Sequence, residues 1–344
     1  MNTLDEQTLT RMLLESGQLT GGVVENAVQT PSSYTAFTSK IYDLRLTYSA
    51  DSTGKRPERA LMKVTEAPIF RAGRAEASFY AFANQDRRQN PDALVEIYGN
   101  LVDDGTRLAV LLMKDMAGPF IGSDWPVPFQ QRDCVRVVQA LAGVHAHWWG
   151  DVRVDAERAT RGAGREADDL RIRSSAQNLI DRLGDALSPG RRALIERLAD
   201  VYPHLHESRL AGSGRQTVVH GDAHLWNFLI PEDESRVSLL IDWQLWGVDF
   251  GAADLAYMMA LHWFPERRQR FEKPLVADYV AALQSLGVDC DFKAVWDDYR
   301  FMVAGLLTKV VVYASVIPAG IWWPHLERAF LAFEDLDCAQ MISR

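Results

Sequence analysis

A polar loop lies between two apolar runs in the stretch Val218-Val219-His220-Gly221-Asp222-Ala223-His224-Leu225-Trp226-Asn227-Phe228-Leu229-Ile230. Short apolar runs bounded by polar residues are typical of buried strands, so the flanks predict a loop held between two strands. Within the loop, Asp222 stands five residues before Asn227. Taken alone, such a pair more often caps a turn than carries chemistry, so its meaning depends on the rest of the chain.

A second apolar run that ends in an acid follows about ten residues later, in Leu239-Leu240-Ile241-Asp242-Trp243-Gln244. Phosphoryl transfer needs a carboxylate that orients or deprotonates the attacking hydroxyl, and it needs oxygen ligands for Mg²⁺. Asp222, Asn227 and Asp242 can supply both kinds of group.

These motifs resemble those of the aminoglycoside phosphotransferase and choline-kinase-like superfamily, including its ecdysteroid-kinase-like branch, which shares the protein kinase fold. His220-Gly-Asp-x-x-x-x-Asn227 followed by Ile241-Asp-Trp243 is similar to the catalytic loop and metal-binding segment of that family. The resemblance implies that Asp222 is the catalytic base and that Asn227 and Asp242 are Mg²⁺ ligands. It also implies ATP or GTP as the phosphate donor and a small-molecule hydroxyl compound as the acceptor.

The amino-terminal part of the chain carries a lysine inside the apolar run Ala60-Leu61-Met62-Lys63-Val64. An ammonium in such a strand is costly unless it meets an anion. Lys63 resembles the phosphate-binding lysine of kinases, which implies a glutamate partner from the next helix, and Glu76 is the candidate. The segment Lys114-Asp115-Met116 resembles the kinase hinge, which implies that the Lys114 carbonyl and the Met116 amide contact the base of the nucleotide.

The chain also departs from the kinase pattern. No Gly-x-Gly-x-x-Gly occurs in the first strand pair, and the Ser/Thr-rich segment Thr30–Thr38 is expected to form the equivalent turn. Lys114 stands where many relatives have an acid, which leaves the choice between ATP and GTP open.

The hydrophobic pattern changes period along the chain. Alternation from Tyr42 to Tyr48 predicts a strand, and further strands are expected at 60–64, 94–102 and 107–113. Two helices are expected in this part of the chain, at 4–16 and 68–85. After Gly118, long helical periods predict helices at 129–149, 166–186, 190–208, 268–286, 292–314 and 324–340, with short strands at 216–219, 227–230 and 237–241. Residues 151–169 are polar and are expected to form an exposed connection.

This order predicts an α+β, bilobal, protein-kinase-like fold. Residues 1–113 are expected to form a small antiparallel-sheet lobe that binds the nucleotide. Residues 114–344 are expected to form the hinge and a larger helical lobe with the catalytic loop and the acceptor pocket.

Composition excludes several classes of function. The net charge is −9 and no basic block occurs, which disfavours nucleic acid as a partner. No apolar run reaches the length of a membrane helix, and the run at 302–312 is interrupted by Lys309. The amino-terminal residues lack a signal-peptide pattern, so a cytoplasmic location is expected. Cys134, Cys290 and Cys338 are interpreted as buried small residues, and the oligomeric state stays open.

The acceptor is expected to be a neutral or cationic hydroxyl compound: an antibiotic, choline or a steroid-type alcohol. This expectation rests on the net charge, on Asp249 and Asp254 near the catalytic segment, and on exposed indole faces. The tryptophans considered for this role are Trp243, Trp246, Trp322 and Trp323. Two alternatives compete with a kinase. One is a zinc hydrolase built on His220, Asp222 and His224, and the other is a pseudokinase that binds nucleotide without turnover.

Overall fold

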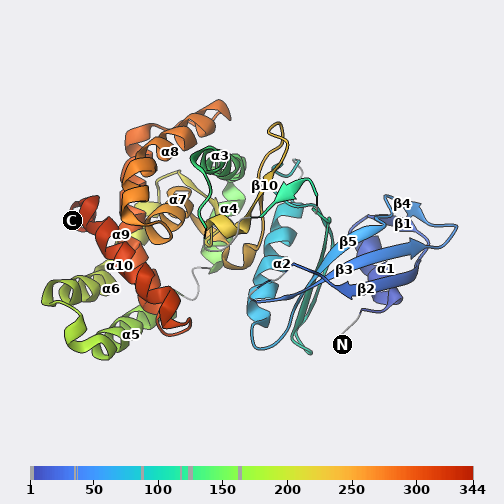
Figure 1. The fold of residues 1–344 in the computed structure, drawn as a ribbon, viewed down its shortest axis with the longest axis horizontal. Coiled ribbons are helices and arrows are strands. Elements are labelled where there is room, and N and C mark those ends of the chain that lie inside the picture. The colour runs from blue at the N-terminus through green and yellow to red at the C-terminus, as the bar shows by residue number, and fades with distance from the viewer. Residues whose placement is uncertain are drawn as a thin grey trace. The chain divides into compact units, whose positions relative to one another are not determined.

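The computed structural model describes residues 4–34, 36, 38–86, 89–116, 118–122, 127–161 and 165–343 (Figure 1). The chain divides into two compact units, which are Met1–Ile121 with Pro231–Trp246, and Gly122–Ile230 with Gly247–Arg344. Residues 231–246 therefore pack with the amino-terminal part, although they follow the catalytic-loop motif in the sequence. The division expected after residue 113 instead places residues 231–246 in the helical lobe.

An antiparallel five-stranded sheet forms the centre of the first unit, in the order β2-β3-β5-β7-β6 (Figure 1). Its strands are β2 Val24–Pro31, β3 Lys40–Tyr48, β5 Arg59–Thr65, β6 Ile97–Asp103 and β7 Leu108–Met113. The unit also contains α1 Glu6–Glu15, α2 Phe70–Asn84 and the short strands β1 Leu19–Gly21, β4 Thr53–Gly54, β8 Phe120–Ile121 and β11 Leu239–Leu240. The strands predicted from alternation and the helix predicted at 68–85 are thus confirmed.

The two helices α1 and α2 cover opposite faces of this sheet. Successive side chains of a strand point to opposite faces, so Met62 and Lys63 of β5 face different helices. Met62 packs in one apolar cluster with Leu9 of α1. On the other face, α2 lies so close that a Cβ on Gly73 would come within 2.5 Å of the Thr65 Cβ. Lys63 therefore points to the side of the sheet that α2 covers.

The second unit is mainly helical. Its helices are α3 Gln131–Trp148, α4 Val152–Arg161, α5 Arg165–Leu183, α6 Pro189–Leu210, α7 Ala252–Ala256, α8 Pro265–Ser285, α9 Phe292–Tyr313 and α10 Ala319–Asp335, with short helical turns at Gly184–Ala186, Leu225–Asn227, Tyr257–Leu261 and Cys338–Ile342. Strand β9 Gln216–Val219 pairs antiparallel with β12 Gly247–Phe250. Strand β10 Phe228–Pro231 begins directly after the Asn227 of the motif.

Two sequence expectations need correction or completion here. Residues 151–169 contain helix α4 and the start of α5, so the expected connection is helical. Val154 is buried, and the other side chains described in this segment are exposed or partly exposed, as expected. Val154 is one buried apolar side chain in a mainly polar helix, so the composition of the segment does not reveal the helix. The expected turn at Thr30–Thr38 overlaps the end of β2, and its residues 35 and 37 lie outside the described part of the chain.

Cys134 and Cys338 are buried as expected, whereas Cys290 is partly exposed. Within the part of the chain that the structure describes, no helix is long and apolar enough to cross a membrane.

Candidate active site

Lys63 makes two ion pairs inside the first unit. Its Nζ lies 2.7 Å from the Glu76 Oε2 and 2.7 Å from the Asp242 Oδ1. Burial opposes the charge of Lys63, but the two carboxylates outweigh burial and raise its pKa. Glu76 is only 1% exposed, and burial raises its pKa despite Lys63. The structure thus brings together three of the residues singled out from the sequence.

Asp242 is held against Lys63 by the segment that follows it. Trp243 stacks on Phe79 of α2 with a centroid distance of 3.8 Å, and the Trp246 Nε1 donates to the Ala75 carbonyl at 2.9 Å. Asp242 itself has a φ of 68°, in the left-handed region that a non-glycine residue enters only at a cost. The stacked and hydrogen-bonded indoles provide the contacts that keep this conformation.

A groove of about 490 Å³ opens on the sheet of the first unit. It is lined by Val28, Thr30, Asp43, Leu44, Arg45, Arg59, Ala60 and Asp115. Arg59 and Lys63 are four residues apart on β5, so they face the same side of the sheet. The volume lies in the range of about 300–1,000 Å³ that is typical of small-molecule pockets.

The hinge-like segment after β7 borders this groove through Asp115, which pairs with Arg59 at 2.8 Å. The Lys114 amide donates to the Glu96 carbonyl at 2.9 Å. Among the described residues, neither the Lys114 carbonyl nor the Met116 amide takes part in a hydrogen bond. These are the two main-chain groups that the resemblance assigns to the base of the nucleotide.

In the second unit, a buried carboxylate fixes the loop that begins at His220. Asp254 accepts hydrogen bonds from the main-chain amides of His220 at 2.7 Å and Gly221 at 2.9 Å. His145 binds the same carboxylate through Nε2 at 3.1 Å and binds the Tyr279 hydroxyl through Nδ1 at 2.7 Å. Burial disfavours the charge of Asp254, but its contact with His145 and these amides lowers its pKa below the usual value.

Asp222 and Asn227 lie together in this loop. The Asn227 Nδ2 donates to the Asp222 carbonyl at 2.9 Å and to its Oδ2 at 3.3 Å, and the Tyr257 hydroxyl donates to the Asp222 Oδ1 at 2.6 Å. Burial alone would raise the pKa of Asp222. His224, the Tyr257 hydroxyl and Lys309 more than offset burial and lower its pKa, so the carboxylate is ionised at neutral pH.

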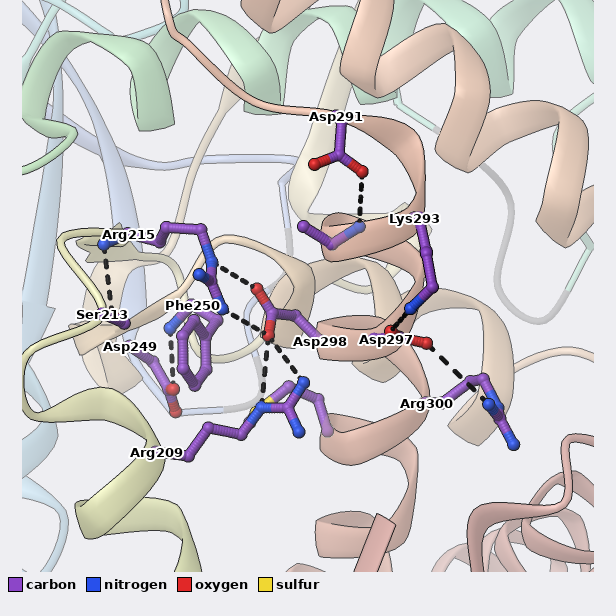
Figure 2. Close-up of polar contacts among 12 residues, drawn as sticks. Arg209, Ser213, Arg215, Asp249, Phe250, Asp291, Lys293, Asp297, Asp298 and Arg300 are labelled. Atoms are coloured by element: carbon purple, nitrogen blue, oxygen red, sulfur yellow. Dashed lines mark hydrogen bonds and ion pairs between the residues drawn. The ribbon is translucent and has the colours of Figure 1, made fainter. Parts of the chain in front are cut away.

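Helix α9 contacts both ends of the β9 strand that leads into the loop. Before the strand, Arg215 binds Asp298 of α9 through two hydrogen bonds, and Arg209 binds the same carboxylate, as Figure 2 shows. After the strand, the Lys309 Nζ donates to the Gly221 carbonyl at 2.6 Å and lies 4.2 Å from the centroid of the Tyr257 ring. One helix thus sets the position of the catalytic-loop motif along β9.

Tyr257 and Lys309 are the residues near Asp222 that sequence reasoning missed. Lys309 had a signal of the same kind as Lys63, because it is a lysine within an otherwise apolar run. It was interpreted only as a break in a membrane-like segment. Tyr257 has no comparable signal, because its contact with Asp222 depends on how the helices pack.

The oxygen donors of Asn227 and Asp242 fit Mg²⁺, which prefers carboxylate and amide oxygens. The two hydrogen bonds of Asn227 to Asp222 use Nδ2, and Oδ1 is the atom of this side chain that can bind a cation. The zinc-hydrolase alternative finds no support, since no three His, Cys, Asp or Glu side chains of the described residues form a group that could hold a metal.

Three of the four indoles expected near the acceptor are buried. Trp243, Trp246 and Trp322 are all buried, with Trp322 only 3% exposed, because each packs into the core of its own unit. Asp249 binds His206, and Asp254 holds the loop backbone. The expectation of exposed indole faces is wrong for these three residues, whereas Trp323 is 38% exposed. The expected neutral or cationic acceptor loses the support of the three buried indoles.

Comparison with known proteins identifies the family. Residues 46–287 match the model of the phosphotransferase enzyme family, so the chain belongs to that family. No curated protein sequence matches the chain.

Three solved structures share the fold at low sequence identity. A candidate aminoglycoside phosphotransferase from Ralstonia eutropha has a TM-score of 0.55 and 14% identity over 93% of this chain and 96% of that one. A microcompartment-associated aminopropanol kinase has a TM-score of 0.53 and 14% identity, with coverage of 92% and 93%. The choline kinase LicA of Streptococcus pneumoniae has a TM-score of 0.52 and 11% identity, with coverage of 91% and 94%. The α+β, protein-kinase-like fold of small-molecule kinases predicted from the sequence is thus confirmed.

Proposed function

We propose that this phosphotransferase moves the γ-phosphate of ATP, or of GTP, to a hydroxyl group of a small molecule. The arrangement of Lys63 between Glu76 and Asp242 carries the proposal. One ammonium between two carboxylates leaves a net charge of −1, with the excess on the side of Asp242, which is 29% exposed. A Mg²⁺-bound polyphosphate would balance both the ammonium and this carboxylate.

The remaining residues have distinct proposed roles. The groove beside Arg59 and the main-chain groups of Lys114 and Met116 would hold the base and sugar of the nucleotide. Asp242 and Asn227 would hold Mg²⁺, which neutralises phosphate charge when it is bound. Glu76 holds Lys63 in place for the phosphates.

Asp222 would orient the acceptor and take its proton. The acceptor oxygen forms a bond to the γ-phosphorus, and the bond from that phosphorus to the leaving oxygen of the nucleoside diphosphate breaks. The hydroxyl proton passes to Asp222 and then to water. A carboxylate whose pKa is lowered is a weak base, so Asp222 acts mainly by accepting a hydrogen bond from the hydroxyl and directing it at the phosphorus.

The first test is nucleotide binding by thermal shift. A ligand that binds only the native state at a hundredfold excess over Kd stabilises it by about 2.7 kcal/mol. We expect ATP or GTP with Mg²⁺ to raise the Tm, and we expect EDTA to remove most of the effect. No response to either nucleotide at millimolar concentration would contradict the proposal.

The same assay separates the alternatives. A response to zinc without any response to nucleotide would favour the hydrolase. A clear nucleotide response without release of nucleoside diphosphate over a broad panel of hydroxyl compounds would favour the pseudokinase.

A further inference from the structure

A row of imidazole rings extends from Asp222 into the helices of the second unit. His224 lies with its Nε2 3.6 Å from the Asp222 Oδ2, and its ring centroid is 5.3 Å from that of His262. His262 is in turn 4.6 Å from His325 of α10. The Tyr257 ring, whose hydroxyl binds Asp222, lies 4.9 Å from His262. These rings are therefore next to the carboxylate that faces the acceptor hydroxyl.

Two of these imidazoles have buried nitrogens without a partner. Among the described residues, the His262 Nε2 and the His325 Nδ1 make no hydrogen bond although solvent does not reach them. Buried polar atoms in native proteins nearly always have a hydrogen-bond partner. Two such nitrogens without a partner near an active site therefore indicate a missing ligand. Burial lowers the pKa of both histidines, so each ring is neutral at neutral pH and can donate or accept.

The fixed charges around this row are positive. Arg328 follows His325 by one turn of α10 and donates to the carbonyl of Leu261, the residue before His262. Its Nε is buried and makes no hydrogen bond within the described residues. Neither Arg328 nor Lys309 has a carboxylate within ion-pair distance in the described part of the chain. Among the described residues, Asp222 is the carboxylate within ion-pair distance of the row, through His224, and in the proposed function it faces the reacting hydroxyl.

We propose that the surface formed by Asp222, His262, His325, Lys309 and Arg328 binds a hydroxyl compound that also carries a carboxylate. The hydroxyl lies at Asp222, the neutral imidazoles hydrogen-bond the polar body of the molecule, and the carboxylate meets Arg328. The inference rests on the proposed phosphotransfer and names the class of its acceptor.

This acceptor class differs from the one in the names of the similar structures. Choline and aminopropanol each carry a cationic nitrogen, which needs an anionic or aromatic partner. Next to Arg328 a cation would be repelled, because Asp222 is the carboxylate near this row and it faces the reacting hydroxyl. An arginine fork, by contrast, matches a carboxylate with two parallel hydrogen bonds.

The test compares matched alcohols that differ only in their second group. Each set contains a carboxylate, the corresponding amide and the corresponding amine on one carbon skeleton, with both linear and aromatic skeletons. With saturating Mg²⁺-ATP, we expect the carboxylate to exceed the amide and the amine in kcat/KM by at least about tenfold, which corresponds to about 1.4 kcal/mol.

A pair of arginine variants assigns this preference to the proposed surface. Arg328→Gln should raise KM for the carboxylate by at least about tenfold while kcat stays within about twofold, which is the pattern of lost acceptor binding. Arg267→Gln is the control. Like Arg328, which lies over the ring of Phe264, Arg267 lies over an aromatic ring and donates to a main-chain carbonyl. It should keep the preference.

The outcomes separate the two proposals. Amines or amides used as well as carboxylates, or an unchanged preference in Arg328→Gln, would overturn the acceptor class and leave the phosphotransfer intact. If no member is phosphorylated, the proposed function fails, and binding is measured alone by thermal shift. Stabilisation by the carboxylates that is lost in Arg328→Gln would still support the surface, and its absence would overturn it.

Discussion

At the scale of single residues, Asp222 and Asp242 have different surroundings and therefore different proposed roles. Asp222 accepts a hydrogen bond from the Tyr257 hydroxyl and lies among cationic groups that keep it ionised. Asp242 contacts Lys63 and stays partly exposed in a left-handed backbone conformation. The first environment suits a group that orients a hydroxyl, and the second suits a ligand of a cation.

Substitution of each aspartate should separate these roles. Asp222→Asn should lower kcat by about 10²–10⁴-fold and leave nucleotide affinity within about twofold, because only the hydroxyl loses its partner. Asp242→Ala should instead weaken Mg²⁺-nucleotide binding by at least about tenfold. Titration calorimetry with a nucleotide analogue and steady-state kinetics measure the two effects. Equal loss of nucleotide affinity in both variants would refute the assignment.

His325 makes stability depend on pH. Burial, with Arg328 and His224 nearby, lowers its pKa from 6.5 to about 4, although Asp222 acts in the opposite direction. Between pH 4 and pH 6.5, His325 therefore binds a proton in the unfolded chain but not in the folded chain. The free energy of unfolding should fall as pH decreases from 6.5 to 4, by about 3 kcal/mol from this group.

Urea unfolding at several pH values measures this slope. His325→Gln should flatten the slope in that window, whereas the exposed His204, changed to Gln, should leave it as it is. A slope that is the same in His325→Gln and in the unchanged protein would show that this group is not responsible.

For charged residues in apolar runs, the sequence predicted a buried partner, and the structure shows one. Lys63 and Asp242 interrupt or end apolar strands, where a charge needs a partner, and the structure supplies that partner for both. Tyr257 and the unpaired His262 could not be found in this way. Their significance depends on neighbours from distant helices, and neither residue type is unusual in a helix.

At the scale of elements, α9 holds β9 by contacts on both sides of the strand. Asp298 binds Arg215 before the strand, and Lys309 binds Gly221 after it. Eleven residues of helix extend about 16 Å, and the six-residue step from Arg215 to Gly221 extends about 20 Å, so the two spans match approximately. The loop that contains Asp222 is therefore fixed by a helix far away in sequence.

Two adjacent carboxylates of α9 give a matched pair for testing this contact (Figure 2). Asp298→Ala leaves Arg209 and Arg215 without their shared carboxylate and should lower the free energy of unfolding by about 2 kcal/mol. This is less than the value for a fully buried pair, because the guanidinium groups are 30% exposed. Asp297→Ala removes a pair with Lys293, which is 84% exposed, and a longer pair with Arg300 at 3.9 Å, and it should cost less than about 0.5 kcal/mol.

Guanidinium unfolding of both variants is the measurement. A cost for Asp298→Ala that is no larger than for Asp297→Ala would mean that α9 does not stabilise β9 in this way.

Periodicity predicted most elements but failed where one residue decides the packing. Strands β3, β5, β6 and β7 of the large sheet and helix α2 agree with the expected positions to within a few residues. Helix α4 was missed because a polar composition outweighed one buried valine, Val154. The strand β2 was missed because its side chains are mostly exposed and do not alternate clearly in hydropathy.

At the scale of the whole molecule, the family match and the two groups of site residues agree on a phosphotransferase. Lys63, Glu76 and Asp242 belong to one unit, and Asp222 and Asn227 belong to the other. The lobes expected from the sequence place Asp242 with Asp222 and Asn227, whereas the chain contacts group it with Lys63 and Glu76. Its return to the first unit depends on Trp243 and Trp246, which pack against α2 and were interpreted instead as candidates for the acceptor pocket.

On a ribosome, residues 1–121 emerge well before residues 231–246, which complete their unit. At roughly 5–20 residues per second, the delay is on the order of ten seconds. During that time Lys63 and Glu76 lack Asp242, and Phe79 lacks the indole that covers it in the finished protein. The nascent first unit therefore exposes an aromatic face of α2 while the rest of the chain is made, and this face is where a chaperone would be expected to bind.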